Sequence, residues 1–511
     1  MKGPRAIMFA LLVSACSSAG NAKPDAGAHS AKSDAGAHSL KADAGDAAQS
    51  AASKRPAGPA ADVSEEITGA NAPFIGAGSG LAVPDGYVEH EYVASGTATA
   101  YAAKGALSMD GRWTFEPDTT AAYRTRVLVR RPASMADASG TVIVEWLNVS
   151  GGIDANPEYA SFEEEIVRQG HVWVGVSAQL IGVAGGPVLV KAPGADNIVG
   201  KGLMTIDPER YGSLDHPGDG YSFDIFTQVA RALWKGGLAL GGAQPKLMLA
   251  AGESQSAIAL TTYYDGVQPL TLVFDGFLVH SRASGSLPLV DPGKYADLAG
   301  SITSSASALL RDDLDAPVVE LQAESDVTGI LNSVVVRQPD GDRFRLWEVA
   351  GTSHADAHLL GSTADMIDCG APINDGPMHL VAKAALHGLE TWVRAGDPPL
   401  IAPRLQVTDA ATPAIVRNDD GIALGGIRTP PVDVPVEALS GAPGSNPDLL
   451  CILLGSAKPL AADRLAQLYP SRAAYQKQYD DATDQTIQSG FVLAPDRDAL
   501  LAFAQPSRIN P

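Results

Sequence analysis

Positive charge is scarce in this sequence. Its 511 residues contain 37 Lys and Arg against 58 Asp and Glu, which gives a formal net charge of -21 at pH 7. Nucleic acids and anionic membrane surfaces are polyanions, and proteins bind them through Lys and Arg. The composition therefore argues against a nucleic-acid partner and against an electrostatic contact with a membrane face.

Long apolar runs are also absent after the N-terminus, because no later run approaches the roughly 20 residues that cross a bilayer. At the N-terminus, Lys2 and Arg5 precede an apolar run over residues 6–13, which is typical of a secretory signal. The run ends in Val13-Ser14-Ala15-Cys16, which resembles the lipoprotein box of bacteria. We expect residues 1–15 to be a lipoprotein signal peptide and Cys16 to carry the lipid. A plain signal peptide with a chance cysteine is the alternative.

Large apolar side chains are almost missing from residues 17–61, where Ala, Gly, Ser, Lys and Asp dominate. Such a segment buries too little surface to offset the entropy lost on ordering it. We expect residues 16–72 to form a disordered tether and residues 73–511 to form the folded domain. Ser17, not Asp, follows the lipoprotein box, which implies an exported protein anchored by lipid at the outer membrane.

The folded part combines two kinds of strand pattern. Stretches rich in Val, Thr and Tyr predict early antiparallel strands, whereas short and almost continuously apolar runs are typical of buried parallel strands. Helix-like segments separate these runs, so we expect an α/β-hydrolase fold with a mostly parallel central sheet and helices on both faces. The expected strands are residues 87–100, 123–131, 141–147, 171–177, 246–251, 272–279, 317–321 and 343–349, and the helices are 158–168, 224–234, 255–264 and 378–394.

Two long loops and a long tail complete the expected domain. Residues 179–221 and 281–309 exceed the usual loop length and are candidates for a lid or a substrate pocket. The tail from residue 399 never becomes linker-like in composition and contains helix-like segments at 461–468 and 472–480. We therefore expect a C-terminal extension packed on the core.

One stretch joins an apolar run to a helix-like run through a turn centred on a serine. It reads Gly252-Glu253-Ser254-Gln255-Ser256, a variant of Gly-x-Ser-x-Gly. A sharp turn between a strand and a helix exposes a serine hydroxyl beside a base, and small flanking residues make room for that turn. We predict that Ser254 is a catalytic nucleophile.

An acid and a histidine follow two later strand-like runs. The run 317–321 leads to Asp326, and the run 343–349 leads to His354. Loops at the carboxyl ends of parallel strands carry catalytic groups, and the order Ser254, Asp326, His354 is that of α/β-hydrolases. We predict that His354 accepts the serine proton and that Asp326 orients the imidazole.

Rival residues lie beside both predicted partners. Glu324 could replace Asp326 as the acid, and His358 could replace His354 as the base. The zinc-protease pattern, with Glu directly after the first histidine, is absent here, so we expect neither a metal site nor another cofactor.

The oxyanion of acyl transfer needs two N–H donors. One comes from the residue after the nucleophile, here Gln255, and the other from the loop after the third strand of the hydrolase sheet. In this loop, Val149-Ser150-Gly151-Gly152, glycine lets the backbone approach a substrate. We expect the second donor within the loop and favour Ser150 or Gly151.

The sequence has only three cysteines. With Cys16 used for the lipid, Cys369 and Cys451 remain as an even pair in an exported chain, so a disulfide between them is expected. Two unpaired buried thiols are the alternative.

Six short motifs of this sequence resemble those of a bacterial α/β-hydrolase-domain family whose members are often secreted. The resemblance extends from about residue 83 to the C-terminus and implies the fold and the roles of Ser254 and His354, but no substrate. The six motifs are Val144-Glu-Trp-Leu-Asn-Val149, Trp173-Val-Gly-Val-Ser-Ala-Gln179, Gly252-Glu-Ser-Gln-Ser-Ala257, Asp275-Gly-Phe, Trp347-Glu-Val-Ala-Gly-Thr-Ser-His354 and Gly425-Gly-Ile-Arg-Thr-Pro430.

These observations together predict a serine hydrolase that cleaves a small carboxylic ester through an acyl-enzyme intermediate. Its contact with a membrane would be the N-terminal lipid alone. An amidase or peptidase with the same triad is one alternative, and a non-catalytic binding protein on a hydrolase scaffold is another.

Overall fold

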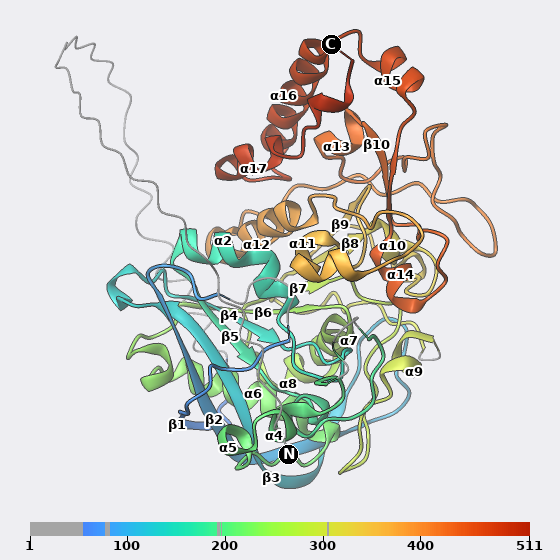
Figure 1. Cartoon of the computed structure of the whole chain (residues 1–511). Helices are drawn as coiled ribbons and strands as arrows, with labels where there is room; N and C mark the ends of the chain where they lie inside the picture. The colour runs from blue at the N-terminus through green and yellow to red at the C-terminus, as the bar shows by residue number, and fades with distance from the viewer. Residues whose placement is uncertain (1–54, 77–81, 192–194, 196, 304–305, 511) are drawn as a thin grey trace, which may run out of the picture. The chain divides into compact units, whose positions relative to one another are not determined.

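A computed structural model of the chain describes residues 55–76, 82–191, 195, 197–303 and 306–510 (Figure 1). All of these residues belong to one compact unit. The predicted signal peptide, Cys16 and most of the predicted tether lie outside the described residues.

A nine-stranded sheet organises this unit, in the order β1-β2-β3-β5-β4-β6-β7-β8-β9. The first three strands form an antiparallel meander, β3 pairs antiparallel with β5, and the strands from β5 to β9 along the sheet are parallel. The strands are β1 (Asp62–Ile67), β2 (Tyr87–Ala103), β3 (Phe115–Pro132), β4 (Thr141–Trp146), β5 (Val172–Val176), β6 (Leu247–Glu253), β7 (Gly276–His280), β8 (Val318–Ala323) and β9 (Phe344–Val349).

Helices cover both faces of the parallel part (Figure 1). Side chains alternate across each strand, so Ile143 of β4 packs in one core with α2 (Pro157–Gln169) and α12 (Met378–Ala395). Val142 and Val144 pack in the opposite core with α6 (Ser222–Trp234) and α7 (Gln255–Thr262). Since β4 to β9 are buried on both faces, they appear in the sequence as nearly unbroken apolar runs.

Further helices lie between these elements and in the C-terminal extension. The α-helical ones are α3 (Leu180–Ala184), α4 (Gly202–Ile206), α5 (Pro208–Tyr211), α8 (Gln268–Thr271), α9 (Leu298–Thr303), α10 (Glu324–Val327), α11 (Ala357–Leu360), α13 (Pro430–Asp433), α14 (Leu449–Leu454), α15 (Ala462–Leu468), α16 (Arg472–Gln488) and α17 (Arg497–Leu501). A π-helical turn, η4 (Tyr263–Val267), joins α7 to α8. Short 3₁₀-helices occur at η1 (Met135–Asp137), η2 (Asp219–Tyr221), η3 (Leu238–Leu240), η5 (Ser333–Val336), η6 (Gly361–Met366), η7 (Ala494–Asp496) and η8 (Pro506–Arg508).

The N-terminal boundary of the folded part differs from the expectation. The predicted tether ran to residue 72, yet β1 lies within it as the edge strand of the sheet, and the Ala61 N–H donates to the Gln228 carbonyl at 2.9 Å. Four of the six side chains of β1 are exposed. An edge strand can therefore form from polar residues, because its backbone pairs with the neighbouring strand while its side chains stay in water. Apolar content was the wrong criterion for this segment.

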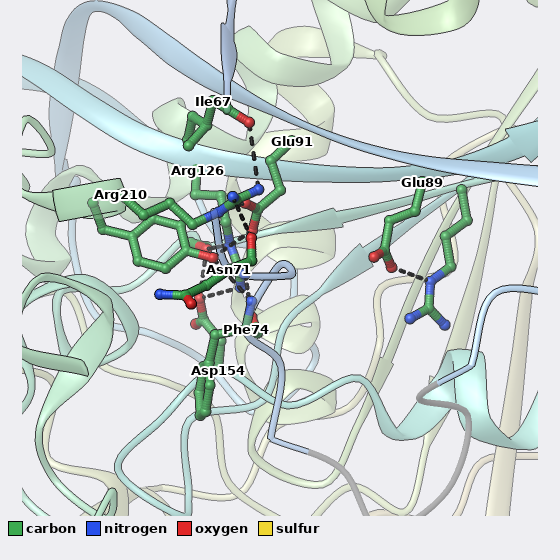
Figure 2. Close-up of polar contacts among 11 residues, drawn as sticks. Ile67, Asn71, Phe74, Glu89, Glu91, Arg126, Asp154 and Arg210 are labelled. Carbon is green, nitrogen blue, oxygen red and sulfur yellow. Dashed lines mark hydrogen bonds and ion pairs between the residues drawn. The ribbon is translucent and has the colours of Figure 1, made fainter. Parts of the chain in front are cut away.

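A buried cluster of charges fastens the N-terminal segment to the sheet (Figure 2). Arg126 of β3 donates to Glu91 at 3.0 Å and to Asp154 at 2.8 Å, and all three side chains are fully buried. The same guanidinium donates to the Phe74 carbonyl, and Arg210 donates to Glu91 at 2.6 Å. This pairing compensates for the cost of burying the charges.

The C-terminal extension packs on the core, as expected. The Ile427 N–H donates to the Glu348 carbonyl of β9 at 2.7 Å, and Phe491 meets Trp347 of β9 edge to face. The extension also contains a two-stranded antiparallel sheet of β10 (Glu437–Ser440) and β11 (Ser456–Pro459). The predicted disulfide is present between the buried residues Cys369 and Cys451, whose Cα atoms lie 5.4 Å apart, and it joins the extension to the segment after β9.

None of the helices in the described part of the chain is both long and apolar enough to cross a membrane.

Candidate active site

Ser254 lies at the sharp turn between β6 and α7. Its backbone has φ 62° and ψ -119°, a left-handed conformation that is strained for a residue other than glycine. A Cβ at Gly252 would lie 2.9 Å from the Ser256 Cβ and 3.0 Å from Leu260. Small residues two positions before and after the serine thus let strand and helix approach closely, as the motif predicted.

Ser254, His354 and Asp326 come together as one hydrogen-bonded chain. The Ser254 Oγ lies 2.7 Å from His354 Nε2, and His354 Nδ1 lies 2.8 Å from Asp326 Oδ1. The three residues follow β6, β8 and β9, whose carboxyl ends meet at the same edge of the sheet. The structure places all three side chains in the relation that the sequence analysis predicted.

The surroundings fix the orientation of the acid and the histidine. Asp326 is fully buried, and its second oxygen accepts hydrogen bonds from the Ser281 hydroxyl and the Ala323 N–H, both at 2.7 Å. A carboxylate at Nδ1 keeps the ring proton there, so Nε2 is free to accept the serine proton. Burial alone would lower the pKa of His354, but the carboxylate of Asp326 outweighs it and raises that pKa.

Glu324, the rival acid, has a structural role instead. Its carboxylate accepts hydrogen bonds from the Gly351 N–H and the Gly441 N–H, each at 2.8 Å, and from Arg417 at 2.6 Å. These contacts tie the turn after β8 to the C-terminal extension. Position in the sequence could not separate the two acids, because only the direction of each side chain distinguishes them.

His358, the rival base, points away from the serine. Its Nε2 lies 3.3 Å from the Ala160 carbonyl, and its ring stacks on His379 with centroids 3.7 Å apart. Within the described ranges, no group of three or more His, Cys, Asp or Glu side chains could hold a metal ion.

The predicted oxyanion donors differ in availability. Gln255 is the first residue of α7, and its N–H has no hydrogen-bond partner among the described residues. The Ser150 N–H already donates to the Asn148 side chain at 2.8 Å, and the Val149 N–H donates to the Gln255 side chain at 3.2 Å. The Gly151 N–H has no partner among the described residues, and an added Cβ there would meet nothing closer than 3.9 Å. The structure therefore favours Gly151 over Ser150.

The two long loops contact each other on the side of the sheet that holds the site. Leu189 and Val190 donate to the Ser150 carbonyl at 2.9 and 3.0 Å, which places the first loop against the predicted oxyanion loop. Tyr295 of the second loop donates to the Gly185 carbonyl at 2.9 Å. That either loop forms a lid or a pocket stays a prediction.

Two polar residues of the site were not predicted from sequence. Asn148 donates to the Glu253 carbonyl at 3.0 Å and so links the oxyanion loop to the nucleophile strand. Glu253 itself is buried, and its carboxylate lies 3.7 Å from His354 Nε2. The place of Glu253 directly before the serine was the only sequence signal for it.

With fold and geometry in view, comparison with known proteins identifies the family. A family model described as an α/β-hydrolase domain matches residues 56–502. The chain belongs to the α/β-hydrolase domain family. This match confirms the resemblance that the six sequence motifs indicated, and it includes β1.

Solved structures with similarity to this α/β-hydrolase are distant. An α/β serine hydrolase without a lid from Xanthomonas campestris is 14% identical with a TM-score of 0.28, covering 58% of this chain and 95% of its own. Carboxyl esterase 2 from Tuber melanosporum is 12% identical with a TM-score of 0.30, covering 69% and 100%. The esterase domain of a Rhodothermus marinus protein is 11% identical with a TM-score of 0.25, covering 59% and 98%. We draw no argument about the substrate from such low scores. The search of curated proteins found no match.

Proposed function

We propose that this α/β-hydrolase cleaves a small carboxylic ester through a covalent acyl-enzyme on Ser254. The observation that carries the proposal is the unbroken chain from the Ser254 hydroxyl through His354 to Asp326, with separations of 2.7 and 2.8 Å. A non-catalytic binding protein would have no need for a strained serine aligned with a histidine and a buried acid.

In the first half of the proposed reaction, the Ser254 oxygen attacks the ester carbonyl carbon while its proton passes to His354 Nε2. The negative oxygen that forms is stabilised by the N–H groups of Gln255 and Gly151. As the bond between the carbonyl carbon and the alcohol oxygen breaks, His354 returns the proton to the departing alcohol.

In the second half, water replaces the alcohol. His354 takes a proton from the water as its oxygen attacks the acyl carbon, and then gives that proton to the Ser254 oxygen as the acid product leaves. Both halves use the same proton position, Nε2, which Asp326 maintains.

Hydrolysis of short p-nitrophenyl esters by the purified full chain in detergent tests this function, with Ser254→Ala as the matched control. We expect turnover by the wild type alone, and a fluorophosphonate probe should label the wild type at Ser254. Equal rates in both proteins would remove Ser254 as the nucleophile. Labelling of Ser254 without cleavage of any ester, together with cleavage of an anilide, would identify an amidase instead.

We also propose that the protein is exported and held at the outer membrane by a lipid on Cys16, with no other membrane contact. The lipoprotein box supports this location, and a disulfide between Cys369 and Cys451 is compatible with an oxidising compartment. Metabolic labelling with a fatty-acid analogue tests it. We expect label in the wild type and none in Cys16→Ala, whereas label in both would place the lipid elsewhere.

A further inference from the structure

Glu253 has an unusual environment for a buried carboxylate. Its side chain is only 7% exposed, and among the described residues no N–H or O–H group donates a hydrogen bond to it. By contrast, the buried carboxylate of Glu145 accepts hydrogen bonds from the N–H groups of Glu158 and Tyr159 and from Trp173. An unsupported buried carboxylate is costly, so a role for it has to be sought in what it faces.

What Glu253 faces is the proton-accepting nitrogen of the site. Its Oε1 lies 3.7 Å from His354 Nε2, the same atom that lies 2.7 Å from the Ser254 hydroxyl. Asp326 contacts the ring at the opposite nitrogen, Nδ1. Two carboxylates thus flank one imidazole, one at each ring nitrogen.

The other groups around Glu253 carry little positive charge of their own. Glu253 and His354 line a small cavity of about 20 Å³, with room for about one water molecule. The other titratable side chains that line this cavity are His280, Asp356, His358 and His379. Burial lowers the pKa of His280, whose Nδ1 lies 3.1 Å from the equally buried Glu158. Burial raises the pKa of Glu253 to about 7, with His354 and His280 opposing the rise and Glu158 and Asp326 adding to it. Of the two histidines, His354 opposes the rise more strongly.

We propose that Glu253 is a second carboxylate of the catalytic histidine, a positioning residue that stabilises the imidazolium of His354 from the Nε2 side. The proposal rests on the function proposed above. When the Ser254 oxygen bonds to the carbonyl carbon, its proton moves to Nε2 and the ring becomes positive. The Glu253 carboxylate attracts that charge without taking the proton, which passes on to the departing alcohol.

The proposal predicts a specific pH dependence. Burial lowers the pKa of His354, but Asp326, and to a smaller extent Glu253, raise it, and the net direction is upward. Since only neutral His354 accepts the serine proton, kcat/KM rises as the histidine loses its proton. Removing the Glu253 charge should therefore move this rise to lower pH by about one unit. The plateau should fall about tenfold, because the transition state loses an attraction to the imidazolium.

Three variants of the full chain test the proposal: Glu253→Gln, which removes the charge, Glu253→Asp, which keeps it, and Glu324→Gln, a matched control that alters a buried carboxylate without contact to His354. The pH profile of kcat/KM is measured beside the titration of His354 by NMR of ¹⁵N-histidine protein, assigned through His354→Gln. In Glu253→Gln, we expect both the kcat/KM profile and the His354 titration to move to lower pH. Both should return at least partly toward the wild type in Glu253→Asp and should be unchanged in Glu324→Gln.

An unchanged His354 titration in a folded Glu253→Gln protein would overturn the proposal, even if the rate fell, because a purely structural role lowers the rate without moving the titration. The two proposals fail separately. A wild type that neither turns over esters nor reacts with a fluorophosphonate refutes the hydrolase function, while a shifted His354 titration in Glu253→Gln would still show the electrostatic link.

Discussion

Ser254 and Ser281 both have a left-handed backbone, with φ of 62° and 56°. Each such residue costs of order 1–3 kcal/mol and persists only where its surroundings enforce it. Both belong to the site, since Ser254 holds the hydroxyl that contacts His354 and Ser281 donates to Asp326. Two of the four described non-glycine residues with positive φ therefore belong to the candidate site, and the other two are Leu272 and Asn332.

Asp326→Asn is the sharpest single-residue test of the acid. The substitution keeps the shape of the side chain but removes the charge that holds the proton on Nδ1 of His354. We expect kcat on a p-nitrophenyl ester to fall by about 10³–10⁴-fold.

Glu324→Gln is the companion to that test. Arg417 and two backbone N–H groups lose a charged acceptor, so the thermal midpoint should fall while kcat of the folded protein stays close to that of the wild type. A larger loss of kcat in Glu324→Gln than in Asp326→Asn would mean that the acid has been assigned wrongly.

At the scale of elements, the parallel strands place the site. The residues after β6, β8 and β9 meet because these strands run in the same direction in the parallel part of the sheet, where β7 alone separates β6 from β8. α7 is buried along its whole length, so it has no polar face, and its sequence carries no amphipathic stripe. The C-terminal extension adds a backbone bond at the end of β9, just before the segment that carries His354.

The disulfide should stabilise the fold without taking part in the reaction. It closes a separation of 82 residues between Cys369 and Cys451. The double variant Cys369→Ala/Cys451→Ala should lose about 2–4 kcal/mol of unfolding free energy in urea. Its kcat should be retained, because the triad is held by β6, β8 and β9. A reductant should lower the midpoint of the wild type and leave the double variant unchanged; a reductant-insensitive wild type would contradict this role.

At the scale of the whole molecule, the Arg126 cluster joins the N-terminal segment, the sheet and the loop that follows β4 (Figure 2). Arg126→Met should lower the unfolding free energy by about 3–5 kcal/mol, since it leaves Glu91 and Asp154 buried without their cation. The measurement is urea unfolding at neutral pH.

Arg112→Met serves as the matched control for that measurement. Arg112 pairs with Asp312 on the surface, where its side chain is 51% exposed, so its loss should leave the midpoint almost unchanged. Equal effects of the two substitutions would show that burial of the Arg126 cluster is energetically unimportant.

Glu253 should also make the stability of the whole domain depend on pH. Burial raises its pKa from 4.5 to about 7, so the folded state binds the proton more tightly than the unfolded state does. The stabilisation that the bound proton gives the folded state is fully present below about pH 4.5 and is lost as the pH rises through about 7. As the pH rises from about 4 to about 8.5, the unfolding free energy of Glu253→Gln should therefore increase by about 3 kcal/mol relative to that of the wild type. Urea unfolding at several pH values checks this, and parallel stability curves would contradict it.

The sequence by itself determined the class of fold, the nucleophile turn and the order of the triad. These features depend on local patterns: unbroken apolar runs mark strands buried on both faces, and small residues around Ser254 mark a sharp turn. Because the chain order of Ser254, Asp326 and His354 follows the order of the strands, their meeting could be predicted without coordinates. The pairing of Cys369 with Cys451 followed from the count of cysteines once Cys16 was assigned to the lipid.

Only the tertiary structure decided which of the neighbouring residues contact His354 and that residues 62–67 belong to the sheet. Asp326 and Glu324 are two residues apart, and the directions of their side chains, set by contacts with distant segments, separate their roles. As the proposed second oxyanion donor, Gly151 is favoured over Ser150 because the Ser150 N–H already donates to the Asn148 side chain. β1 was recognised only through its backbone pairing with β2. The role proposed for Glu253 rests on its distance to a histidine about 100 residues away in the sequence, a separation that no local pattern encodes.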